Sequence, residues 1–143
     1  MAGVFKHIIE TNDLLDGTYV EPFVGGGSVA LSLLLNDYVS RIVINDKASS
    51  IFASWPTALN DAEWLCREVS DTPVDMDVWR RQKAVQANKE DADLRELGFS
   101  TFFLNRTNRS GIIKGGVIGG NDQTGNYLID ARLNKTDLVE RIE

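Results

Sequence analysis

The sequence predicts an α/β fold, and three of its features lead to that prediction. Residues 18–20 are typical of the end of a short strand, and a glycine turn at residues 25–27 leads into an apolar helix. A second apolar strand, residues 41–44, ends close to Asp46. From about residue 48 to residue 108 the pattern is mostly helical. Because a doubly wound domain keeps alternating strand and helix, we infer that a helical insertion interrupts such a domain here.

A short helix is expected before the first strand. Val4, Phe5 and Ile8 recur at helical spacing, and Asp16-Gly17 is a turn signal after them. His7 lies on this helix, and we interpret it as a surface or half-buried side chain.

The glycine turn has the composition of a nucleotide-binding loop. Gly25, Gly27 and Ala30 fit the spacing G-x-G-x-x-(G/A), and Ser28 is expected to cap the helix that follows. Glycines leave no Cβ between main chain and ligand, and a helix start presents free N–H groups. The same residues also suit a tight turn that binds nothing. The position of Asp46 favours the ligand-binding interpretation, because nucleotide-binding folds place an acidic residue that accepts from ribose hydroxyls about 20 residues after the glycine turn.

Helices of the insertion are predicted from their start and stop signals. A helix from about residue 48 is expected to end or kink at Pro56, and Asn60 or Asp61 is expected to cap the next one. Thr72-Pro73-Val74-Asp75 has the pattern of a cap followed by a proline in the first turn, which predicts a helix that runs to about Gln86. A charge cluster at residues 88–93 then leads into another helical stretch.

Trp79 has two interpretations. It is followed by Arg80, Arg81 and Lys83, so it could stack on a nucleobase. A tryptophan at helical spacing from other apolar residues is more often part of the core, and we favour that interpretation.

Residues 106–135 differ in composition from the rest of the chain. They hold five basic residues against two acidic ones, and six of the twelve glycines. Residues 112–120 are typical of a β-hairpin, with two short apolar strands around Gly115-Gly116. Such a hairpin can lie along nucleic-acid phosphates, or it can be a surface hairpin whose arginines pair with nearby acids. Charge alone favours neither interpretation.

A last helix is predicted from Lys135 onward, with Asn134 as its cap. No glycine, proline or turn residue ends it before Glu143, so we expect that the chain is cut from a longer design.

Composition limits the class of protein. The 143 residues suit one domain, and 43% hydrophobic and 25% charged residues are ordinary for a globular protein. No apolar run approaches the ~20 residues of a membrane span, and the N-terminus lacks a signal-peptide core, which predicts a cytoplasmic protein without a membrane partner. Cys66 is the only cysteine and is expected in the core. Because the chain also has only one histidine, His7, no cysteine/histidine metal site is expected. The net charge of −6 argues against a protein that coats nucleic acid, but it allows a local basic patch.

Two motifs resemble those of one enzyme family. Residues 19–29 look like the S-adenosylmethionine motif of the Dam-like (D12 class) DNA adenine-N6 methyltransferases, and Ile44-Asn45-Asp46 looks like the acidic motif that follows it. Residues 103–112 are similar to the family's asparagine-arginine segment, which leads into a DNA-contacting hairpin. The resemblance runs from about Phe5 onward and covers only the N-terminal part of a family member.

The resemblance implies a partial methyltransferase fold of the Rossmann-like type, with a helical insertion and a β-hairpin that recognises double-stranded DNA. Residues 1–47 would begin the cofactor-binding domain, residues 48–133 would form the target-recognition region, and residues 134–143 would return to the methyltransferase domain. The implied cofactor is S-adenosyl-L-methionine, bound by Glu21, Pro22, Phe23, Gly25, Gly27 and Asp46. The implied DNA contacts are Asn105, Arg106, Arg109, Ser110 and Lys114. The implied role is site-specific DNA methylation, as in restriction–modification, without a metal.

Two motifs of the family are absent. The family holds the target amine with an Asp/Asn-Pro-Pro-aromatic tetrapeptide, but Pro22, Pro56 and Pro73 are the only prolines and none are adjacent. The early Gly-Gly-Lys segment that lines the cofactor is also missing. We therefore predict that this chain contains no catalytic residue and that it does not methylate DNA alone. A second polypeptide that supplies the missing tetrapeptide is one partner that would fit this prediction.

Two other hypotheses stay open at this point. One is a non-catalytic DNA-binding or partner subunit that keeps the methyltransferase scaffold. The other is a nicotinamide-dependent Rossmann domain, which the proline at the strand end and the long helical insertion make less natural.

Overall fold

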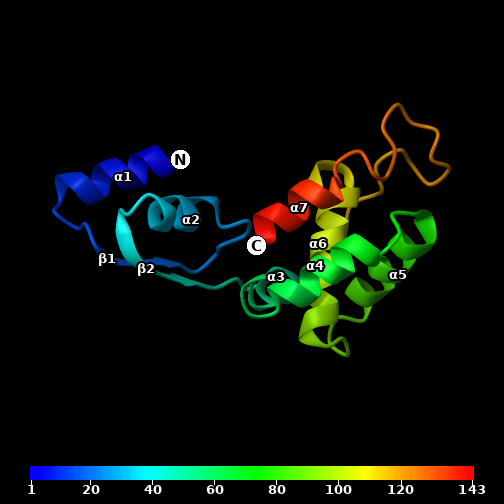
Figure 1. Cartoon of the computed structure of the whole chain (residues 1–143), viewed down its shortest axis with the longest axis horizontal. Coiled ribbons are helices and arrows are strands. Elements are labelled where there is room, and N and C mark those ends of the chain that lie inside the picture. Colours follow the sequence, from blue (N-terminus) through cyan, green and yellow to red (C-terminus); the bar gives the residue numbers. More distant parts are fainter. The chain divides into compact units, whose positions relative to one another are not determined.

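The computed structural model describes all residues from 1 to 143, and the chain forms two compact units, residues 1–51 and 52–143 (Figure 1). The first unit contains α1 (Ala2–Thr11), β1 (Gly17–Glu21), α2 (Ser28–Leu35) and β2 (Val39–Ile44). The boundary falls within α3 (Ser49–Asn60). The second unit continues with α4 (Ala62–Asp71), α5 (Met76–Ala87), α6 (Leu94–Thr107), the short 3-10 helix η1 (Arg109–Gly111) and α7 (Lys135–Ile142). The predicted mixture of helices and strands is confirmed, and the strands form a small parallel sheet.

In the first unit, β1 and β2 pair in parallel and α2 forms the crossover between them, as a strand–helix–strand unit requires. Tyr19 lies opposite Ile42, and both contact the core of Ile9, Leu33 and neighbouring side chains that α1 and α2 supply. Both helices therefore cover one face of the strand pair (Figure 1). The other face is open, with Val20 58% and Val43 41% exposed.

The second unit is helical around one apolar core. Leu65 of α4, Val78 of α5, and Phe103 and Leu104 of α6 are fully or almost fully buried there, and Leu138 of α7 joins them. The last helix is thus part of this core. Cys66 is buried, as expected, and its burial raises the pKa of the thiol.

Pro56 does not end its helix, although an end is one of the two outcomes that the sequence predicts for it, and Pro73 does not open a helix. Pro56 lies inside α3, because the helix on either side is held in the second unit by the buried Ala53 and Thr57. Thr72, which precedes Pro73, is extended and ends α4, while the Asp75 carboxylate accepts from the N–H groups of Asp77 and Val78 and caps α5.

The predicted pair of strands at residues 112–120 is replaced by one antiparallel bridge, which joins Asn108 to Val117. The reason is that side chains occupy the carbonyl groups that a first strand would use. The Asn108 amide donates to the carbonyls of Ile112 and Ile113, each at 2.9 Å, and the Lys83 ammonium donates to those of Ile113 and Gly115.

None of the helices is both long and apolar enough to cross a lipid bilayer.

Candidate cofactor site and recognition loop

The glycine turn between β1 and α2 depends on two left-handed residues. Gly25 has φ +50° and Gly27 has φ +66°, a region that glycine enters without a Cβ clash. The Gly27 N–H donates to the Val24 carbonyl at 2.8 Å, and the Gly27 carbonyl accepts from the Leu31 N–H. Gly27 is therefore the N-cap of α2, and Ser28, which the sequence predicts as the cap, is the first helical residue.

Two acidic residues hold this turn from its two sides. The Glu21 carboxylate, at the end of β1, accepts from the Ala30 N–H in the first turn of α2 at 3.1 Å. The Asp46 carboxylate, just beyond β2, accepts from the Gly25 N–H at 3.0 Å and from the Ala48 N–H at 2.9 Å. Because β1 and β2 are parallel, their carboxyl ends meet at one edge of the sheet, and both acids lie at that edge. Gly25 and Asp46, which are 21 residues apart in the sequence, are therefore in direct contact.

The turn leaves space for a ligand. A Cβ built on Gly25 or Gly26 would meet no atom within 4 Å, so the main chain at these positions is open to close approach. Phe23 lies in the same loop and is 73% exposed, an unusual state for a large aromatic side chain. The carboxylate of Asp46 has further lone pairs beyond the two that the amides use. An amphipathic ligand with an aromatic ring and hydroxyl groups, such as S-adenosylmethionine, therefore fits the residues present.

Pro22 is the least informative member of the predicted cofactor set. It is exposed, and its carbonyl accepts only a long hydrogen bond of 3.5 Å from the Asn45 amide.

The predicted DNA-contacting residues lie at the end of α6 and in the loop that follows it. Asn105 is exposed and donates from its amide to the Gly111 carbonyl at 3.1 Å. Arg109, Ser110 and Lys114 are exposed, and Ser110 has a left-handed backbone with φ +55°. Arg106 is half-buried. We call residues 108–120 the recognition loop from here on.

Asn108 organises the recognition loop, and the sequence analysis missed it. Its side chain is 0% exposed. Its amide oxygen accepts from the Trp79 indole N–H at 2.7 Å, while its amide nitrogen donates to the carbonyls of Ile112 and Ile113. Trp79 is thus a structural neighbour of the loop and packs against the core, as the favoured interpretation has it. Only the position of Asn108 within the asparagine-arginine segment, residues 103–112, could have indicated this role.

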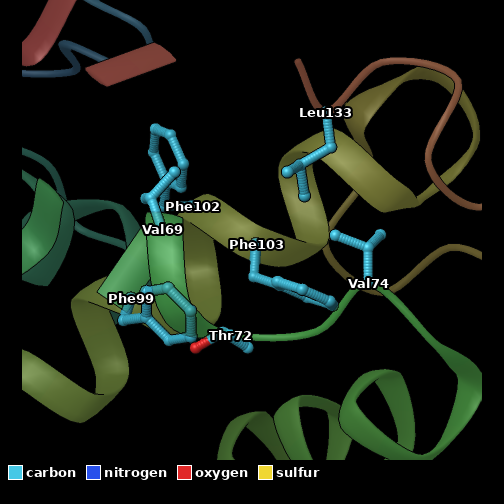
Figure 2. A pocket seen from close by; sticks show the side chains of 7 residues that line it. All are labelled: Val69, Thr72, Val74, Phe99, Phe102, Phe103 and Leu133. Atoms are coloured by element: carbon cyan, nitrogen blue, oxygen red, sulfur yellow. The ribbon is translucent and has the colours of Figure 1, made fainter. Parts of the chain in front are cut away.

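A small hollow in the second unit is no ligand site. It measures about 10 Å³ and is lined by apolar side chains and Thr72, with the rings of Phe99 and Phe103 along it (Figure 2). That volume is at the lower limit for one water molecule.

Comparisons with known proteins point in one direction. A sequence model for the D12 class of N6 adenine-specific DNA methyltransferases matches residues 1–115. The Type II methyltransferase M.MjaIII of Methanocaldococcus jannaschii is similar to this chain, with 28% identity over 106 residues, which cover 67% of this chain and 37% of the relative. The chain therefore spans well under half the length of that curated relative. No solved structure matches.

Proposed function

Because the chain belongs to the D12 class of N6 adenine-specific DNA methyltransferases, we propose that it carries the S-adenosylmethionine site and the DNA-recognition region of such an enzyme. The observation that supports this most is the pair of acids at the sheet edge: Glu21 and Asp46 shape a glycine turn that is open above Gly25. S-adenosylmethionine would supply the methyl group. Residues 1–47 would bind it and residues 48–133 would contact the DNA, while residues 134–143 would lead back to the methyltransferase domain.

The proposed cofactor contacts follow from the loop. Gly25 and Gly27 would back the ligand, Phe23 would cover its adenine ring, and Asp46 would accept from the ribose hydroxyls. Glu21 and Pro22 would line the site where β1 leads into the glycine turn.

The proposed DNA contacts follow from charge and exposure. Arg109 and Lys114 would contact phosphates from the recognition loop, and Asn105, Arg106 and Ser110 would lie beside them. Arg109, Ser110 and Lys114 are presented by the recognition loop, whose carbonyls accept hydrogen bonds from the side chains of Asn108 and Lys83. Neither Arg109 nor Lys114 is engaged in a salt bridge within the chain, so the alternative of a surface loop whose basic groups pair with acids is less well supported.

Calorimetric titration tests the cofactor assignment. We expect S-adenosylmethionine and S-adenosylhomocysteine to bind and NAD not to bind. Asp46→Ala should weaken binding about tenfold or more, because it removes a charged acceptor and releases the Gly25 N–H. Glu10→Ala is the matched control, since it removes an acid of the same unit that contacts only Tyr38 on the surface. Equal affinities for the two variants would refute the role of Asp46.

We also propose that the 143 residues alone transfer no methyl group, because they contain no adjacent prolines and thus no Pro-Pro tetrapeptide to hold the target amine. A labelled-methyl assay on mixed-sequence duplex DNA should give background incorporation. Activity that persists through further purification would contradict this. Incorporation that appears only when a polypeptide with the tetrapeptide is added would support the proposed second partner.

A non-catalytic DNA-binding subunit is the second candidate. It is favoured by the missing Gly-Gly-Lys and Pro-Pro motifs. Such a subunit would bind duplex DNA but would show no binding heat with S-adenosylmethionine or S-adenosylhomocysteine in the calorimetric titration.

A further inference from the structure

A second loop follows the recognition loop directly and extends away from the helices of the second unit (Figure 1). We call its residues 121–128 the tyrosine loop. The Gln123 amide nitrogen donates to the carbonyls of Ile118 and Gly120, at 2.8 and 2.7 Å. Its amide oxygen accepts from the Ile129 N–H at 2.9 Å. Both hydrogens and the oxygen of this amide are thus engaged, and the Gln123 side chain ties the tyrosine loop to the end of the recognition loop and to the segment that follows.

Gly119 closes the neck of the tyrosine loop through its main chain. It has φ +86°, and its carbonyl accepts from the Gly125 N–H at 3.2 Å. A Cβ built on Gly119 would lie 2.8 Å from the Tyr127 carbonyl oxygen and 3.2 Å from the Leu128 Cα, so only glycine fits between the two arms. Surface loops whose ends meet and which are packed by their own side chains hold a defined shape. The tyrosine loop is such a loop.

The side chains at the outside of the tyrosine loop contribute little to the fold. Tyr127 is 74% exposed, a high value for a tyrosine. Asn121, Thr124 and Asn126 are exposed as well. The hydrogen bonds that fix the loop come from Gln123 instead. A loop that is fixed from within, and that turns an aromatic ring and uncharged hydrogen-bonding groups to solvent, is suited to contact a partner.

The position of Arg109 indicates that this partner is DNA. A Cβ built on Gly120, the residue before the tyrosine loop, would lie 4.0 Å from a guanidinium nitrogen of Arg109. The loop therefore begins beside a side chain that we propose to contact phosphate. The tyrosine loop itself has no lysine or arginine and carries one acid, Asp122, so it is poorly suited to bind phosphates. Its amide, hydroxyl and carboxylate groups instead match the donors and acceptors of base edges, which carry the sequence information.

We propose that the tyrosine loop enters a groove of the DNA duplex next to the phosphate contact of Arg109 and determines which sequence is bound. Asn121 and Asn126 supply hydrogen bonds to base edges, and the Tyr127 ring packs against the bases beside them. Gln123 is a positioning residue, because it holds the loop without reaching the DNA. This inference rests on the proposed DNA-binding function and adds the residues that give it sequence preference.

Selection of bound duplexes from a pool that is randomised in its central segment tests the tyrosine loop in the full chain. The wild type should enrich a preferred sequence, and Tyr127→Ala and Asn126→Ala should each enrich a more degenerate one. Tyr127→Ala should weaken binding to the preferred duplex about tenfold and binding to a scrambled duplex much less. The slope of log affinity against log salt should stay unchanged, because no charge that neutralises a phosphate is removed.

The opposite pattern is expected from the recognition loop. Arg109→Ala with Lys114→Ala should weaken binding to the preferred and the scrambled duplex alike, and it should flatten the salt slope by roughly one unit per phosphate contact removed. Leu59→Ala is the control for Tyr127→Ala, because it removes an exposed apolar side chain of the same unit from α3. Its affinity and its enriched sequence should match those of the wild type.

Gln123→Glu tests the positioning role, because it keeps the shape of the side chain and removes the donor to two carbonyls. It should weaken binding to the preferred duplex about as much as Tyr127→Ala, again with the salt slope unchanged. The double variant should lose little more than either single variant, since both changes act on the same contact. Additive losses would overturn the positioning role of Gln123.

Two results would overturn the proposal as a whole. One is a Tyr127→Ala variant that enriches the same sequence as the wild type and binds it as tightly, which is the result expected if the loop contacts a protein instead. The other is a wild type that binds duplex DNA but enriches no sequence. Failure of the proposed DNA-binding function is a different result, namely a wild type that binds neither the pool nor the scrambled duplex.

Discussion

Replacing Asn108 with alanine is expected to destabilise the second unit by about 2–4 kcal/mol, because three part-buried hydrogen bonds are lost at once. The Trp79 indole N–H loses its acceptor and the Ile112 carbonyl loses the Asn108 amide as a donor, while the Ile113 carbonyl keeps only the hydrogen bond from Lys83 at 3.3 Å. Each such group typically costs about 1–3 kcal/mol when it is left unpaired away from water. Partial relaxation of the exposed loop keeps the total below the sum.

Tryptophan fluorescence during guanidinium denaturation measures this effect selectively, since Trp55, Trp64 and Trp79 all belong to the second unit. Asn88→Ala is the control, because that side chain is exposed and donates only to the Ala84 carbonyl of its own helix. It should change stability by less than about 0.5 kcal/mol. A similar loss for both variants would mean that the Asn108 network contributes little.

Asn108→Ala should also weaken DNA binding, because Arg109 and Lys114 would no longer be presented by an ordered loop. The salt slope should change little, since no phosphate-contacting charge is removed. A variant with reduced stability but unchanged affinity for DNA would show that the recognition loop keeps its function without this frame.

The sequence predicted the first unit well because local rules decide it. A strand, a glycine turn, an apolar helix and a second strand each have their own pattern, and the parallel pairing that brings Asp46 to Gly25 follows from the strand–helix–strand order. The glycine turn was correct in outline. The cap was misassigned to Ser28, because only the left-handed backbone of Gly27 shows that the helix begins at Ser28, one residue earlier than a cap at Ser28 would imply.

The second unit was harder to predict because tertiary contacts override local signals there. Pro56 stays within α3, where its neighbours Ala53 and Thr57 are buried. The hairpin signal at residues 112–120 was read as two strands, but the carbonyls it needs are bound by Asn108 and Lys83, which come from other elements.

Gly98→Ala is the second large effect that we expect, with a loss of about 2–4 kcal/mol from the second unit. An alanine in a helix normally stabilises by about 1 kcal/mol over glycine, and Gly98 lies inside α6. Here a Cβ would lie 2.2 Å from the Thr57 hydroxyl and 2.8 Å from the Ala53 carbonyl, both in α3. The hydroxyl could turn away, but the carbonyl belongs to a helix backbone, so α3 and α6 would have to separate.

Two further variants test that explanation by the same fluorescence measurement. Gly116→Ala places a methyl group where no atom lies within 4 Å, and it should change stability by less than about 1 kcal/mol, with a gain as the expected sign. Thr57→Ala in the Gly98→Ala background should recover part of the loss, because it removes the nearest contact but leaves the Ala53 carbonyl and the Cβ at position 57, each at 2.8 Å. No recovery would locate the strain at those two remaining contacts, whereas a stabilising Gly98→Ala would mean that α3 and α6 do not pack at the separation described.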